Sequence, residues 1–162
     1  MPIAVGERLP DATLFELIDE GPVKRSVAEV FEGRTIALFG VPGAYTPTCH
    51  NRHMPSFVEA APAFADHGVD EIVCVAVNDP FVLGAWAEAS GAKRVGIRVI
   101  SDPAAELVGA MGLSFDASAR GLMTRSRRFS ALVRDRELAV LNLEDAPGKA
   151  EATTAPVLLK QI

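Results

Sequence analysis

Three short apolar runs, each followed by a helix-like segment, constrain the fold of this chain more than any other feature. They span residues 35–41, 71–77 and 94–100. Apolar residues at nearly every position are typical of strands buried on both faces, as in sheets that helices cover on either side. The alternation therefore predicts an α/β fold.

Helix signals fill the segments between these runs. Apolar residues within 57–65 recur at spacings of three and four, which places them on one face of a helix that ends near residues 67–68. Pro55 and Pro62 should kink or interrupt this stretch, because proline removes a hydrogen bond and clashes one turn back. Asp79-Pro80 and Asp102-Pro103 each pair a good N-cap with a good first helical residue, so we expect two more helices to begin there.

The C-terminal third has a different pattern. Residues 129–133 and 137–143, separated by three polar residues, predict a β-hairpin. The segment 145–155 is expected to be a loop, and a short helix should follow Thr153-Thr154. A hairpin added to the alternating segments predicts a mixed central β-sheet flanked by helices on both faces, in a single domain over residues 1–162.

Cys49 lies where the first predicted strand turns into a helix. Thr46 is a good N-cap and Pro47 a good first helical residue, so Cys49 should occupy the third helical position. Unpaired N–H groups and the helix dipole lower the pKa of a thiol placed there. A buried, inert cysteine is the alternative. We favour a reactive thiolate, because Pro42-Gly43 breaks the strand and Tyr45-Thr46-Pro47 should aim the cysteine at a pocket mouth.

Composition narrows the partners and the compartment. The net charge of −5 and pI near 5.2 argue against nucleic acid or an anionic membrane as the main partner. No apolar run approaches the ~20 residues of a membrane span. The first residues lack the pattern of a secretory signal, and two cysteines suit a reducing compartment, so we expect a cytoplasmic protein.

The segment 42–49 resembles the peroxidatic-cysteine signature of the peroxiredoxins, which is defined by a proline, a threonine and the cysteine at these spacings. Residues 53–57, 77–81 and 121–129 resemble the type II, or peroxiredoxin-5-like, subfamily. The resemblance implies a thioredoxin-like fold, a homodimer, and reduction of hydrogen peroxide and alkyl hydroperoxides. It also implies no metal and no organic cofactor.

The resemblance further implies which residues act. Cys49 would attack the peroxide and become a sulfenic acid, while the Thr46 hydroxyl, the Cys49 N–H and the Arg128 guanidinium would hold the substrate. Pro42 and Gly43 would complete the peroxide-binding site. Strand alternation lets only one of Arg127 and Arg128 point at the thiolate, and the family match selects Arg128.

His53 lies four residues after Cys49 and raises the alternative of a Cys-His protease or a zinc site. A structural zinc site needs four ligands and a catalytic one usually three, whereas only His50 and His53 are near Cys49 in sequence. We therefore predict no metal and a structural role for His53.

Cys74 is the candidate resolving cysteine, but its place inside an apolar strand favours a buried thiol. The loop 148–154, where other relatives carry a resolving cysteine, has none. We therefore expect one-cysteine chemistry, with glutaredoxin and glutathione, or thioredoxin, as the reductant. The chain contains no Cys-x-x-Cys pair, which argues against a disulfide oxidoreductase. A redox sensor or chaperone that uses Cys49 without efficient turnover stays open as an alternative.

Overall fold

A seven-stranded mixed sheet forms the centre of the computed structural model, which describes all of residues 1–162. The strand order is β2-β1-β5-β4-β3-β8-β9, with β3, β4 and β5 parallel and the other neighbours antiparallel. The strands are β1 (Thr13–Ile18), β2 (Gly21–Ser26), β3 (Thr35–Gly40), β4 (Glu71–Ala76), β5 (Arg98–Ser101), β8 (Phe129–Arg134) and β9 (Glu137–Leu143). A separate pair, β6 (Ser114–Asp116) and β7 (Thr124–Ser126), lies outside this sheet.

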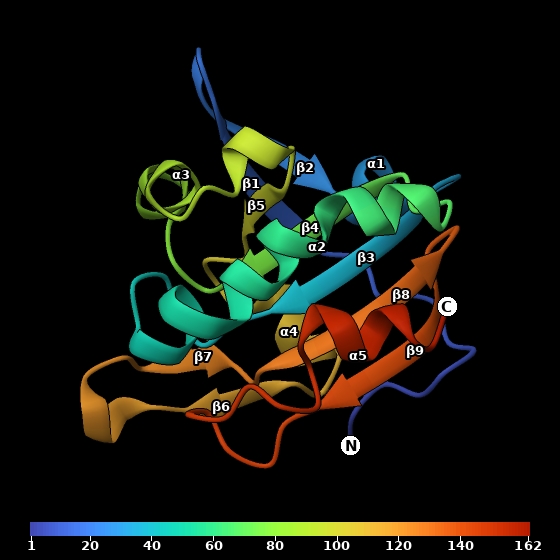
Figure 1. Ribbon diagram of the computed structural model, residues 1–162. Coiled ribbons are helices and arrows are strands. Elements are labelled where there is room, and N and C mark those ends of the chain that lie inside the picture. Colours follow the sequence, from blue (N-terminus) through green and yellow to red (C-terminus); the bar gives the residue numbers. More distant parts are fainter.

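Helices cover both faces of the sheet, as expected (Figure 1). One face is covered by α2 (Met54–Asp66), α3 (Pro80–Ala89) and α5 (Ala155–Leu159), which bury Phe57, Trp86 and Leu158 in one apolar cluster. The other face packs α1 (Val27–Phe31) and α4 (Glu106–Ala110) in a second cluster. None of the helices combines the length and apolarity that crossing a bilayer would need.

Two expected element starts are wrong by several residues. The third apolar run begins as a 3₁₀ turn at residues 93–95 that ends in left-handed Gly96, so β5 starts only at Arg98. The helix expected at Pro103 begins at Glu106, because Ala105 takes a left-handed conformation. The Asp102 carboxylate still accepts hydrogen bonds from three N–H groups of α4. Asp102 therefore still caps the helix, although the helix begins later in the sequence than predicted.

The first 34 residues contain elements that were not predicted. β1 and β2 form an edge hairpin that turns at residues 19–20, and β2 begins at Gly21, whose φ of +118° suits glycine alone. Exposed and half-buried residues alternate along β2, so it lacks the apolar run that identified the inner strands. The side chain of Ser26 caps α1 by accepting from the Glu29 N–H at 3.1 Å.

The helical stretch after Cys49 is divided into two helices, as expected, but the prolines do not divide it. A π-helical turn, η1 (Cys49–His53), precedes α2, and the change of helix type falls before Pro55. Pro55 lies in the first turn of α2, where a missing N–H costs little. Pro62 lies inside α2 without ending it.

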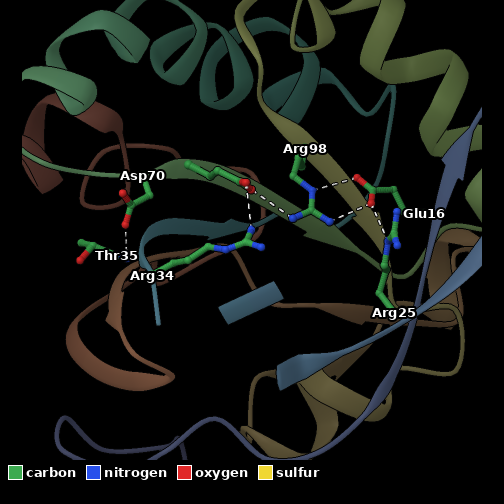
Figure 2. Close-up of polar contacts among 7 residues, drawn as sticks. Glu16, Arg25, Arg34, Thr35, Asp70 and Arg98 are labelled. Atoms are coloured by element: carbon green, nitrogen blue, oxygen red, sulfur yellow. Dashed lines mark hydrogen bonds and ion pairs between the residues drawn. The ribbon is translucent and has the colours of Figure 1, made fainter. Parts of the chain in front are cut away.

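A chain of charged side chains ties the amino ends of the parallel strands together (Figure 2). Arg98 at the start of β5 donates to Glu16 of β1 at 2.8 and 3.0 Å and to Glu71 of β4 at 3.1 Å. Arg25 and Arg34 extend the chain at either end, each at 3.0 Å. Burial raises the pKa of Glu16, but its bonds to Arg98 and Arg25 outweigh burial and hold that pKa below its usual value. Cys49 follows the opposite, carboxyl end of β3, where ligands gather in such sheets.

Candidate active site

The turn after β3 places Cys49 at a helix start. Helical structure begins at Pro47, and Cys49 is the third helical residue, as predicted. Cys49 also opens the π-turn η1, whose end is closed by the Met54 N–H donating to the Cys49 carbonyl. N–H groups of a first helical turn have no partner within the helix and favour negative charge beside them.

Thr46 does not cap this helix with its side chain, contrary to the prediction. Its hydroxyl donates to the Gly43 carbonyl at 2.7 Å, while its own carbonyl accepts from the His50 N–H at 2.9 Å. The reason is the tight turn before it, in which Tyr45 has a φ of +63° and folds Thr46 back over Gly43. The Thr46 oxygen consequently keeps lone pairs that can accept a further hydrogen bond.

The Cys49 side chain is fully buried, so the expected pocket mouth is absent. The cause is packing: Cys49 belongs to the apolar cluster under α2 and α3, and the C-terminal loop covers its turn. A surface hollow of about 710 Å³ lies between the β1–β2 hairpin and α3 and includes neither Cys49 nor Arg128.

Arg128 reaches the sulfur from the start of β8. Its Nη2 donates to Cys49 Sγ at 3.1 Å, and only 2% of the residue is exposed. Phe129, the next residue, pairs with Gly40 at the end of β3. A Cβ at Gly40 would lie 2.0 Å from the Phe129 ring, so the ring can pack over this position only because it is glycine.

The rest of the Arg128 guanidinium is held by neutral acceptors. Nη1 contacts His53 Nδ1 at 3.1 Å, and Nε and Nη2 donate to the Pro147 carbonyl at 3.3 and 2.8 Å. None of the ion pairs of the structure includes Arg128, so no carboxylate is paired with its guanidinium. A buried cation without a counterion is costly, and the sulfur is the one contact atom that can carry negative charge.

His53 is a neutral hydrogen-bonding link. Its Nε2 contacts the Thr153 carbonyl at 2.9 Å, which can only accept, so Nε2 carries the proton and Nδ1 accepts from Arg128. Burial, and then the Arg128 charge, lower the pKa of His53 to about 3. His50 instead accepts from Trp86 Nε1 at 3.0 Å. His50 and His53 are therefore each engaged in hydrogen bonds with other side chains or backbone groups.

Cys74 lies in β4, in the same apolar cluster as Cys49, and both thiols are free. Burial, reinforced by the nearby Cys49, raises the pKa of the Cys74 thiol well above its usual value, although Arg128 opposes the shift. A thiol in this environment is protonated and a poor nucleophile.

Two contacts of the turn were missed from sequence. Arg125 is half-buried and donates to the Pro42 carbonyl at 3.2 Å and to the Leu122 carbonyl at 2.7 Å. Asn78 accepts from the Ala44 N–H at 2.9 Å. Local sequence patterns cannot reveal either contact, because each one joins the turn to a segment that is distant in sequence.

Comparisons with known proteins identify the family of this chain. Residues 4–158 match the Redoxin family. Peroxiredoxin-2E-2 of rice is 44% identical over 164 residues, covering 99% of this chain and 72% of that protein. The chain belongs to the peroxiredoxins. Reduced Prx3 of Vibrio vulnificus, solved in complex with hydrogen peroxide, superposes with a TM-score of 0.92 at 39% identity, over 98% of each chain.

The peroxiredoxin assignment extends to the subfamily and the activity. Peroxiredoxin 5 of Alvinella pompejana superposes with a TM-score of 0.83 at 32% identity, over 99% of each chain. The resemblance to type II, peroxiredoxin-5-like proteins and the thioredoxin-like fold are thus confirmed. This peroxiredoxin is a thiol-dependent peroxidase that reduces peroxides at the expense of a thiol reductant.

The buried, neutral state of His53 predicts a loss of stability in mild acid. The unfolded chain binds a proton on this ring below about pH 6.5, whereas the folded protein does so only near pH 3. Unfolding therefore takes up a proton, and the free energy of unfolding should fall by about 2 kcal/mol between about pH 7 and pH 5. Urea unfolding across this range measures the decline.

His53→Asn should remove this decline, and the same substitution at exposed His67 should leave it in place. An equal decline in wild type and His53→Asn would contradict the buried neutral ring.

Proposed function

We propose that Cys49 is the peroxidatic nucleophile of this peroxidase. The Cys49 thiolate attacks one peroxide oxygen, an S–O bond forms and the O–O bond breaks. The sulfur is oxidised to a sulfenic acid, while the departing oxygen takes a proton and leaves as water or an alcohol. The observation that carries this proposal is the buried Arg128 guanidinium, which has no carboxylate partner and donates to Cys49 Sγ at 3.1 Å.

Arg128 and Thr46 are proposed to hold the peroxide in line with the sulfur. Arg128 Nη2, already at the sulfur, is placed to donate to the charge that develops on the oxygens as their bond breaks. The Thr46 hydroxyl gives its proton to Gly43, so its oxygen can accept from a peroxide O–H. The tight turn through Pro42 and Gly43, braced by Arg125, would form the wall beside them.

This assignment predicts distinct effects of three substitutions on the rate of peroxide consumption. Cys49→Ser should abolish turnover. Arg128→Lys keeps the charge but loses the planar set of donors, and should slow the reaction about 100- to 1,000-fold. Arg127→Lys, at the neighbouring half-buried position, is the matched control and should stay within a few-fold of wild type. Stopped-flow kinetics with hydrogen peroxide decides, and an Arg128→Lys protein as fast as wild type would overturn the proposed site.

We propose one-cysteine chemistry for recycling, with glutaredoxin and glutathione, or thioredoxin, attacking the oxidised Cys49 directly. Cys74 is buried and protonated and stays a bystander. Because Cys49 is itself fully buried, a protein reductant can reach its sulfur only if the turn 47–53 opens locally.

Counting thiols after one equivalent of peroxide tests this scheme. We expect loss of one thiol and a mass gain of one oxygen, and Cys74→Ser should keep turnover with glutaredoxin or thioredoxin. Loss of both thiols without added oxygen would establish a disulfide that includes Cys74. Slow stoichiometric oxidation with no turnover under either reductant would instead favour a redox sensor or chaperone.

A homodimer in the cytoplasm completes the proposal. Tyr45, beside the cysteine turn, is 50% exposed, and Phe81, at the start of α3, is 63% exposed. Exposed aromatic residues of this kind suit an interface with a second copy. Both cysteines are free thiols, which suits a reducing compartment.

A further inference from the structure

The loop between β9 and α5, residues 144–154, is folded around one buried carboxylate. We call this loop the strap. Glu144, only 6% exposed, accepts four hydrogen bonds from the far end of its own loop. The donors are the Glu151 N–H at 3.1 Å, the Ala152 N–H at 3.2 Å, the Thr153 N–H at 2.8 Å and the Thr153 hydroxyl at 2.6 Å. The carboxylate thus closes the strap into a ring.

The closed strap presents two backbone carbonyls to the active site. The Pro147 carbonyl accepts from Nε and Nη2 of Arg128 at 3.3 and 2.8 Å. The Thr153 carbonyl accepts from His53 Nε2 at 2.9 Å. A third carbonyl, that of Gly148, accepts from the Thr48 hydroxyl at 3.0 Å and ties the strap to the cysteine turn.

The Pro147 carbonyl holds Arg128 directly, and the Thr153 carbonyl holds it through His53. The Pro147 carbonyl fixes the edge of the guanidinium that also faces Cys49. The Thr153 carbonyl keeps the His53 proton on Nε2, so Nδ1 stays an acceptor for Arg128 Nη1. Thr153 is fully buried and is the residue that Glu144 binds twice.

We propose that Glu144 is a positioning residue for the peroxidase reaction, which acts on Arg128 through the Pro147 and Thr153 carbonyls of the strap. Glu144 contacts none of Cys49, Thr46 and Arg128 with its side chain. Its carboxylate fixes the loop, the loop fixes the guanidinium, and the guanidinium meets the sulfur and the peroxide. The inference rests on the proposed role of Arg128.

The charge on Glu144 suits this role. Burial alone would raise its pKa, but the Thr153 hydroxyl and the N–H groups of residues 151–153 outweigh burial and hold the pKa of Glu144 below its usual value. The group is therefore ionised at neutral pH, and an ionised carboxylate accepts stronger hydrogen bonds than a neutral amide.

The test is Glu144→Gln, made both in wild type and in Arg128→Ala. Glutamine keeps the shape of the side chain but replaces one oxygen by an NH₂ group, which cannot accept from the strap. In the wild-type background the second-order rate constant with hydrogen peroxide should fall about 10- to 100-fold, because small displacements of positioned groups cost that much. In the Arg128→Ala background the same substitution should cost less than about two-fold, since the positioned group is gone.

Two further measurements separate positioning from loss of structure. Alkylation of Cys49 by iodoacetamide does not use a positioned peroxide, so in Glu144→Gln its rate should fall less than the rate with hydrogen peroxide. Glu151→Gln makes the same chemical change at an exposed carboxylate of the strap and should leave both rates unchanged. If Glu144→Gln does not fold, Thr153→Val removes the hydroxyl donor alone and should show the same pattern with a smaller loss.

These experiments distinguish failure of the positioning role of Glu144 from failure of the proposed function. A wild-type rate in Arg128→Ala would overturn the site itself. A normal Arg128 requirement combined with no effect of Glu144→Gln, or with equal losses in both Arg128 backgrounds, would overturn the positioning role alone.

Discussion

A buried guanidinium facing a buried sulfur is the constraint on which the rest of this structure depends. Arg128 is almost fully removed from water and has no carboxylate partner. The Pro147 carbonyl and the His53 imidazole accept from its N–H groups but cannot balance its charge. The Cys49 sulfur is the remaining contact of the guanidinium, and this contact is the basis for proposing Cys49 as the peroxidatic nucleophile.

The fold assembles Cys49, Arg128 and the strap from three segments that are distant in sequence. The cysteine turn follows the carboxyl end of β3, Arg128 precedes β8, and the strap follows β9. Because β8 pairs antiparallel with β3, its first residue lies beside the end of β3 and therefore beside the turn. β9 runs back along β8 and returns the chain to the same edge, where the strap closes over the site.

The sequence predicts the parts of this arrangement that local rules control. The inner strands, the C-terminal hairpin and the helix start at Pro47 all follow from apolar runs and turn residues. The edge hairpin β1–β2 escaped prediction because its second strand alternates polar residues without an apolar run. The late start of α4 escaped because left-handed Ala105 has no sequence signature.

The site divides in the same way. The family signature points to Cys49, Thr46 and Arg128, and the structure places Arg128 at the sulfur. Sequence alone gave the wrong exposure for Cys49, because its burial depends on helices and a loop packed over it from elsewhere. The contacts of His53 and Glu144 could not be predicted either. Each depends on the strap, whose shape comes from hydrogen bonds between side chains and backbone groups that no periodicity records.

¹⁵N-edited NMR of the Arg128 side chain tests the contact between Arg128 and Cys49 most directly. A guanidinium held at Nε, Nη1 and Nη2 should give separate, slowly exchanging Nη proton signals in the reduced protein, assigned by their loss in Arg128→Lys. Cys49→Ala should shift the Nη2 signals, and Cys74→Ala should leave them in place. Signals averaged by rapid rotation, like those expected of exposed Arg120, or unmoved by Cys49→Ala, would contradict a guanidinium fixed on the sulfur.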